Sequence, residues 1–325
     1  MGPTSLGRSV QPVEPLTRRS LFAAAAGGLA APLLTPSAFG QEAVPERALP
    51  EVIVPGSETI DTLDLRNDLF GRVTTQVYLN GQGPFRFLVD TGANRSVLTA
   101  ATAARVGARP IGEREVHGVS GTKIAPMVQL DNIRCGAFEQ RNAEVPILSD
   151  DLLFPADGAL GMNRFAGLRL EFDNDSSTMI VKRSGHRWSG SISMPATIRF
   201  GQLVSARARV GSLSVPVIFD TGAEYGLANL AFKNAVEKRT HKTLATPVRL
   251  SNAAGPIFVD DTVEIPLLRF ENCEARNVTA YIGDFHIFKL WNMIEQPALI
   301  VGMRVLRTVS RFAIDYGRKE MQFVA

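Results

Sequence analysis

The sequence predicts an all-β protein made of two homologous lobes within one chain of 325 residues. Residues 87–93 (FLVDTGA) recur as residues 217–223 (VIFDTGA), at an offset of 130. Later landmarks recur in the same order at slightly larger offsets, and short segments alternate between apolar and polar residues with many β-branched or aromatic side chains.

The later landmarks are Arg141 and Asn142, which recur as Arg276 and Asn277 at an offset of 135, and residues 169–173, which recur as residues 311–315 at an offset of 142. A constant order with slowly rising offsets indicates a duplication with small insertions in the second copy. We therefore expect an N-terminal lobe over residues 56–190 and a C-terminal lobe over residues 191–325, with a linker at residues 184–190.

Individual strands, turns and helices are predicted from short residue patterns. Residues 73–79 predict a strand, residues 80–84 (NGQGP) a turn and residues 85–89 the next strand. In the second copy residues 210–212 take the place of the turn before a strand at residues 215–219. Helical pattern is sparse, with candidates at residues 100–106 and 230–239.

The N-terminus has the layout of an export signal. Arg18 and Arg19 precede an alanine-rich apolar run that ends near Leu34, and small residues follow up to Gly40. The paired arginines resemble a bacterial twin-arginine signal, so residues 1–40 are expected to direct export and to be cleaved after Gly40. A retained anchor is the alternative, but the run is shorter than the roughly 20 residues that span a bilayer. Residues 41–55 are expected to form an extended linker.

Composition narrows the class of protein. Apolar residues make up 45% of the chain, which is enough for real cores. The 35 basic and 32 acidic residues are scattered, which disfavours a nucleic-acid partner. The four histidines show no metal-ligand spacing.

Cys135 and Cys273 align with Phe270 and Phe138 of the opposite copy, so both thiols are expected to pack as apolar groups; a disulfide is the alternative for an exported protein.

The repeated DTGA motif carries the chemistry. Each copy delivers an aspartate at the end of an apolar strand, followed by a glycine that permits a tight turn. If the two turns meet, Asp90 and Asp220 lie within a few ångströms and share a proton, because like charges that close do not both ionise. One carboxylate can then take a proton from water while the other carboxyl donates to an amide carbonyl.

These motifs resemble those of the retropepsin-type aspartic proteases, and the two-lobed layout resembles that of pepsin. Residues 159–162 (ALGM) and 299–303 (LIVGM) resemble the apolar strand that packs beside the catalytic turn in that family. The resemblance covers essentially the whole mature chain and implies two β-barrel lobes around a central cleft. It implies the following roles: Asp90 and Asp220 as the catalytic dyad; Thr91 and Thr221 in interlocking hydrogen bonds; Gly92 and Gly222 in the turns; and Gly118, Gly121, Asn252 and Gly255 in loops that could form a flap.

The chain departs from the family at several positions. Ala93 and Ala223 match the retroviral form, Glu224 adds an acid near the dyad, and the first flap loop offers His117 where pepsin-like enzymes carry a tyrosine. Either loop, or both, could close over the cleft. Residues 285–291 (FHIFKLW) have no counterpart of equal length in the first lobe, and are either an insertion at the cleft edge or a packed loop.

Together these features predict an exported aspartic endopeptidase, found in the bacterial periplasm or secreted. It is expected to act as a monomer on peptides or proteins, without a cofactor or metal and without the membrane once the signal is removed. Two alternatives stay open: a non-catalytic peptide-binding or structural protein on a protease scaffold, and lobes that pair between chains.

Overall fold

The computed structural model describes residues 59–240, 248–252, 255–259 and 261–324. The expected export signal (residues 1–40) and linker (residues 41–55) lie outside the described residues. The described residues are mostly β, with 55% in strands and 13% in helices, which confirms the predicted all-β class. Among the described residues, no helix is long and apolar enough to cross a bilayer.

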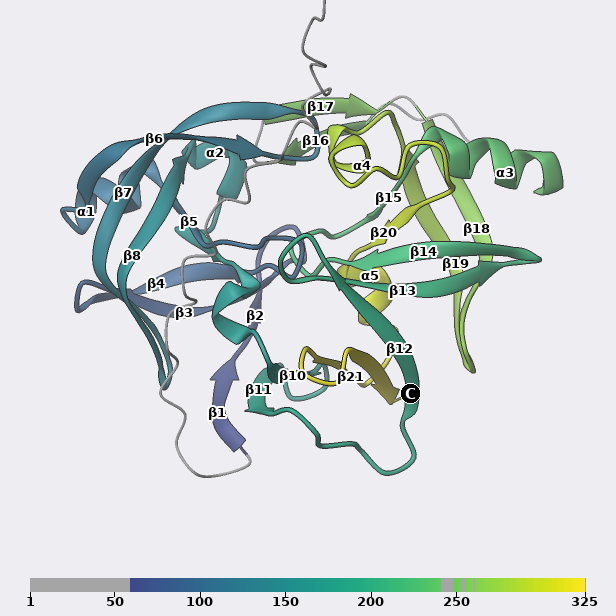
Figure 1. Cartoon of the computed structure of the whole chain (residues 1–325), viewed down its shortest axis with the longest axis horizontal. Helices are drawn as coiled ribbons and strands as arrows, with labels where there is room; N and C mark the ends of the chain where they lie inside the picture. The colour runs from purple at the N-terminus through teal and green to yellow at the C-terminus, as the bar shows by residue number, and fades with distance from the viewer. Residues whose placement is uncertain (1–58, 241–247, 253–254, 260, 325) are drawn as a thin grey trace, which may run out of the picture. The chain divides into compact units, whose positions relative to one another are not determined.

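The first lobe is a closed ring of strands flanked by two further strands (Figure 1). The ring runs β3–β4–β9–β5–β8–β7 and closes where β7 pairs back with β3. Its members are β3 (Val73–Leu79), β4 (Gln82–Val89), β9 (Gly158–Leu160), β5 (Val97–Thr99), β8 (Phe138–Leu148) and β7 (Thr122–Cys135). The flanking strands are β2 (Arg66–Asn67) beside β3 and β6 (Arg109–His117) beside β7.

The second lobe repeats this ring in the same order. It runs β13–β14–β20–β15–β19–β18 and closes where β18 pairs with β13. Its members are β13 (Leu203–Val210), β14 (Leu213–Phe219), β20 (Leu299–Val301), β15 (Gly226–Ala228), β19 (Cys273–Ile282) and β18 (Asp261–Phe270). A separate hairpin of β16 (Val248–Asn252) and β17 (Gly255–Val259) occupies the chain position that β6 and the start of β7 have in the first lobe.

Short helices join the strands. They are α1 (Ala100–Arg105), α2 (Asp150–Leu153), the 3-10 helix η1 (Met162–Phe165), α3 (Leu230–Thr240), α4 (His286–Leu290) and α5 (Met303–Leu306). The Thr99 side chain caps α1 by accepting from the Thr102 N–H at 3.1 Å, and Asn229, 130 residues later, accepts from the Phe232 N–H at 2.8 Å at the start of α3. Both helices expected from the sequence are confirmed.

Local differences from the sequence expectations have simple causes. The turn expected over residues 80–84 is only two residues long, because Asn80 and Gly81 adopt positive φ and the strand resumes at Gln82. Cys135 and Cys273 are free thiols, so the alternative disulfide is wrong. Cys135 pairs with Phe138 at one hairpin end and Phe270 pairs with Cys273 at the equivalent end, which confirms the predicted exchange of packing residues.

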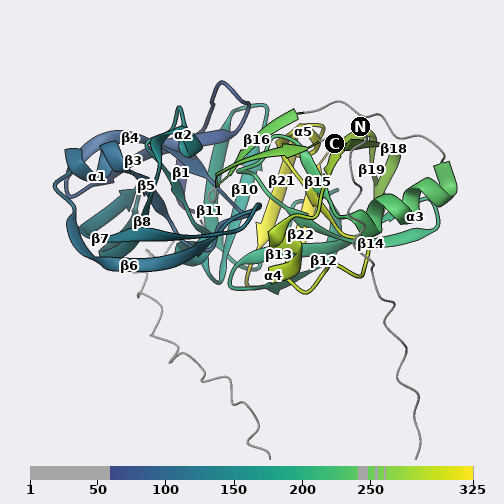
Figure 2. The same ribbon diagram turned by 90° about the horizontal axis from the view of Figure 1, so that it is seen from above.

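A six-stranded segment joins the two lobes and continues into the second ring through the pairing of β12 with β13, and Figure 2 shows β10 and β21 between the lobes. Its order is β1 (Thr59–Asp64), β11 (Thr178–Arg183), β10 (Leu168–Asp173), β21 (Arg311–Asp315), β22 (Glu320–Val324) and β12 (Ile192–Arg199). At the centre, Glu171 pairs with Ala313 and the rings of Phe172 and Phe312 stack at 4.6 Å. Glu171 and Ala313 are 142 residues apart, which is the offset at which this segment recurs in the sequence. The pairing of β10 with β21 is therefore symmetric about these two residues.

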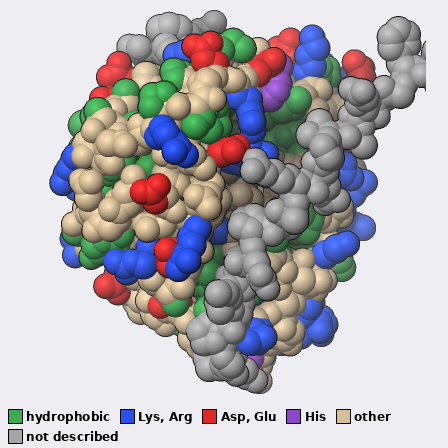
Figure 3. All heavy atoms as spheres, turned by 60° about the vertical axis from the view of Figure 1, so that its left-hand side comes forward, with side chains coloured by type: hydrophobic (Ala, Val, Ile, Leu, Met, Phe, Trp, Pro, Cys, Tyr) green, Lys and Arg blue, Asp and Glu red, His purple; other side chains and the backbone are tan. Residues whose placement is uncertain are grey.

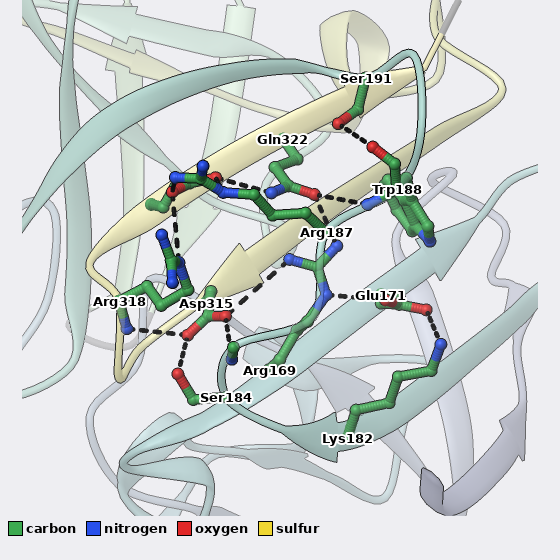
Figure 4. Close-up of polar contacts among 12 residues, drawn as sticks. Arg169, Glu171, Lys182, Ser184, Arg187, Trp188, Ser191, Asp315, Arg318 and Gln322 are labelled. Carbon is green, nitrogen blue, oxygen red and sulfur yellow. Dashed lines mark hydrogen bonds and ion pairs between the residues drawn. The ribbon is translucent and has the colours of Figure 1, made fainter. Parts of the chain in front are cut away.

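One face of this sheet carries a buried polar network (Figure 4). Arg169, which is fully buried, donates to Glu171 at 2.7 Å and to Gln322 at 2.9 Å, and lies 4.0 Å from the Asp315 carboxylate. The segment between β11 and β12 covers the network, with Trp188 lying against the guanidinium of Arg169 at 4.9 Å. The linker is thereby fixed to both halves of the sheet.

We expect Arg169→Met to destabilise the protein by about 3 kcal/mol, because it removes the fully buried cation between the Glu171 and Asp315 carboxylates. The urea midpoint at neutral pH measures this loss. Arg269→Met is the matched control, since Arg269 lies on the surface in a 2.8 Å ion pair with Glu274 and its removal should change stability little. Equal stability of the Arg169 variant and the parent would contradict the structural role of the network.

Candidate active site

Two loops, one from each lobe, meet at the centre of the molecule. Asp90 follows β4 and Asp220 follows β14, and each of these strands runs parallel to a short strand, β9 or β20. The Asp90 N–H donates to Leu160 O at 3.2 Å, and the Asp220 N–H donates to Val301 O at 2.9 Å. The strand ends therefore hold the two aspartates in matching positions.

The threonines lock the two loops together. The Thr91 hydroxyl accepts from the Thr221 N–H at 2.9 Å and donates to Phe219 O at 2.8 Å. Reciprocally, the Thr221 hydroxyl accepts from the Thr91 N–H at 3.1 Å and donates to Val89 O at 2.6 Å. Both threonines are fully buried, and each hydroxyl is satisfied as donor and acceptor. The four bonds fix the distance and orientation between the lobes at this point.

The glycines of the motif allow the loops to approach this closely. A Cβ placed on Gly92 would lie 2.6 Å from Cγ of Asp220, and one on Gly222 would lie 2.5 Å from Cγ of Asp90. Each glycine also donates its N–H to the aspartate of its own loop, at 2.9 Å from Gly92 and 2.8 Å from Gly222. Each loop therefore needs glycine because the aspartate of the other lobe occupies the space of a side chain.

A second layer braces each loop from behind. The Met162 N–H donates to Ala93 O at 2.9 Å, and in the second lobe the Met303 N–H donates to Ala223 O at 2.8 Å. Just before Met162, Gly161 passes so close that a Cβ would lie 2.2 Å from the backbone carbon of Arg95. The repeated residues 159–162 and 300–303 thus support the loops, as the sequence resemblance implies.

The two carboxyl groups are hydrogen-bonded to each other, and their surroundings differ. Desolvation raises the pKa of Asp90 well above its usual value, and the charge of Asp220 and the hydrogen bond to it raise that pKa further. Desolvation also raises the pKa of Asp220, but N–H groups of Gly222, Gly92 and Ala223 act in the opposite direction. The pKa values of both carboxyls are raised, so the pair retains a shared proton above the range in which a free aspartate titrates.

Two hairpins extend from the barrels toward the opposite lobe. Gly118 and Gly121 form the tip between β6 and β7, where the Gly118 N–H donates to Gly121 O at 2.8 Å. This tip reaches α4 of the second lobe through a hydrogen bond from the Ile287 N–H to Val119 O at 3.4 Å. Asn252 and Gly255 form the last described pair of β16 and β17, and β16 lies against α2 of the first lobe.

Several neighbours of the site were not assigned from the sequence. Asn94 directly follows the first motif and ties the lobes together by donating to Phe200 O and accepting from the Gln202 N–H at 2.8 Å. Arg72 acts electrostatically on Asp90 and lowers its pKa. Glu224 instead acts on Tyr281, whose pKa is raised chiefly by desolvation. The position of Asn94 beside the motif was the available signal, whereas no local pattern marks Arg72.

Residues 285–291 form α4 and its flanks and are well packed. Phe285, Phe288 and Trp291 belong to an apolar cluster that also includes Ile218, two residues before Asp220. A smaller helix, α2, holds the equivalent position in the first lobe, where Leu152 and Leu153 pack in a cluster with Leu88, two residues before Asp90. The segment is therefore a longer, aromatic version of a shared element.

Comparison with known families agrees with this geometry over part of the chain. Residues 75–164 match the family model described as Aspartyl protease. The match begins within β3, includes the first DTGA loop and ends within η1, and it supports placing this part of the chain in an aspartyl protease family. No curated protein matches the chain.

We expect Gly92→Ala to lower the free energy of unfolding by about 1–3 kcal/mol, because the methyl group would overlap the Asp220 carboxyl. Chemical denaturation measures the change. Gly121→Ala is the matched control: its Cβ would meet no atom within 4 Å and its φ is not positive, so stability should be retained. An unaffected Gly92 variant would show that the loops do not approach this closely.

The aspartate pair should also make stability depend on pH. Since the folded state holds a proton with a raised pKa, it binds more protons than the unfolded chain above the ordinary aspartate range, and stability falls as pH rises through that window. Asp90→Asn removes the repulsion, so its melting temperature relative to the parent should increase as pH rises from about 4 to about 8. Calorimetry across this range tests the sign, and Asp220→Asn should behave in the same direction.

Proposed function

We propose that the chain is an aspartic endopeptidase in which Asp90 and Asp220 form the catalytic pair. The observation that carries the proposal is the hydrogen-bonded pair of carboxyls, one from each lobe, fixed by reciprocal threonine hydrogen bonds. The aspartyl protease match over residues 75–164 supports the same reaction class. The repeated strand order and the self-consistent β10–β21 register support a duplicated, two-lobed layout.

In the proposed reaction, a water molecule bound between the carboxyls attacks the carbonyl carbon of a peptide bond. The ionised carboxylate of the pair accepts a proton from the water, while the protonated partner donates its proton to the carbonyl oxygen. The resulting tetrahedral diol collapses when a proton passes to the leaving nitrogen, giving a carboxyl and an amine product. No covalent bond to the protein forms, and the residues named need no cofactor.

The surface agrees with a peptide or protein substrate better than with nucleic acid. On the face drawn in Figure 3, basic and acidic side chains are interspersed, and no broad basic tract covers that face. We further propose that the protein acts as a monomer, since the four threonine hydrogen bonds form within one chain. Export through the signal at residues 1–40 would deliver it to the periplasm or the medium.

Digestion of a mixed peptide library between about pH 3 and pH 8 tests the activity. We expect cleavage by the parent, lost above the raised pKa of the pair, because both carboxyls are then ionised and no proton donor remains. Asp90→Asn and Asp220→Asn should each reduce the rate by about 10³-fold or more.

Asp131→Asn serves as the matched control, since Asp131 is exposed on β7 and should retain activity. Cleavage that persists in either pair variant would contradict the shared mechanism. Peptide binding without cleavage at every pH would favour the non-catalytic alternative. A dimeric mass in solution would favour lobes that pair between chains.

A further inference from the structure

The β6–β7 hairpin bridges the two apolar clusters that flank the aspartate pair. Beside its tip, Val116 on β6 and Ala125 on β7 pack in the first-lobe cluster with Leu88. At its tip, Val119 packs against the second-lobe cluster that contains Phe285 and Phe288. The tip region of the hairpin therefore contacts apolar clusters of both lobes.

A pair of histidines holds the tip on α4. Nδ1 of His117, at the end of β6, lies 3.3 Å from Nε2 of His286, the first residue of α4. The ring centroids are 5.6 Å apart and the ring planes differ by 9°. The centroid separation exceeds the nitrogen separation by about the sum of the two ring radii, so the nitrogens meet head-on, as in a linear N–H···N hydrogen bond.

Whether this hydrogen bond forms depends on how many protons the two rings carry. It needs one N–H and one lone pair, so it forms when both rings are neutral and also when one ring is charged. When both rings are charged, two N–H groups face each other, no acceptor remains and the like charges repel. The hydrogen bond between the two rings therefore persists when one ring is protonated and is lost when the second ring is protonated as well.

The charged groups around the pair favour this behaviour. Oε1 of Glu115 lies 3.8 Å from the outer Nε2 of His117 and can pair with that ring when it is charged. On the neighbouring strand, Lys123 pairs with Val116, beside His117. Around His286, Asp284 precedes it by two residues and Lys289 follows it by three. A second proton would place a second positive charge beside the first, with a nitrogen separation of 3.3 Å in the closed contact.

We propose that His117 and His286 form a proton-operated latch that keeps the β6–β7 hairpin closed on α4 at neutral pH and releases it in acid. Its consequence for catalysis rests on the function proposed above: acid would open access to the aspartates in the same pH range in which the pair retains its proton. The latch itself is a statement about hairpin position and can be tested without measuring activity.

The distance between the hairpin tip and α4 is the direct measurement. Spin labels are placed at Ser120→Cys and Lys289→Cys, both exposed positions, after Cys273→Ser removes the half-buried native thiol; Cys135 is fully buried. The added changes Asp90→Asn and Asp220→Asn remove titration of the aspartate pair. Electron–electron dipolar spectroscopy at about pH 7.5 and about pH 4.5 should show a short distance that gives way to longer ones, with the open-to-closed ratio rising on the order of tenfold.

The matched control is the double variant His117→Gln and His286→Gln in the same labelled background. Its amides cannot become charged, so its distance distribution should not change between the two pH values. The proposal is overturned if the histidine protein shows one distribution at both pH values, or if the glutamine variant opens in acid as the histidine protein does. Acid opening in a protein that cleaves no peptide would leave the latch standing and reject the proposed function alone.

Discussion

The reciprocal hydrogen bonds of Thr91 and Thr221 are the interaction on which the rest of the site depends. Each hydroxyl links its own turn to the turn and preceding strand of the other lobe, and both lie in fully buried positions where an unmade bond would be costly. This rigid contact brings two carboxyls together against their mutual repulsion. Burial of this site, and after it the nearby charge of Asp220, raises the pKa of Asp90.

Much of the fold was predictable because motifs in the first half of the sequence recur in the second half, so the two halves can be aligned with each other. The recurrence of FLVDTGA as VIFDTGA identified the two loops, and the drifting offsets aligned the remaining strands without any other sequence. The exchange of Cys135 and Phe138 for Phe270 and Cys273 was visible in that alignment and corresponds to equivalent hairpin ends in the structure. Local alternation and turn residues located β3, β4 and β14 to within about three residues.

Contacts between segments distant in sequence could not be predicted in this way. The bond between His117 and His286 joins residues 169 positions apart, and neither lies in a repeated motif. Arg169 lies within a repeated segment, but its partner Gln322 is defined only by the order of strands in the joining sheet. Such contacts depend on register and on how the lobes pack, which the spacing of residues within one lobe does not determine.

The pairing of Glu171 with Ala313 at the centre of the joining sheet has a consequence for how such a molecule can diversify. In an assembly of two identical subunits, a residue on the symmetry axis faces a copy of itself, and glutamate there would oppose glutamate. In a single continuous chain the two facing positions are separate residues and need not be identical. It can keep one acid on the axis, neutralise it with Arg169 and Lys182, and place a methyl group opposite, so the two halves are free to acquire different residues wherever they touch.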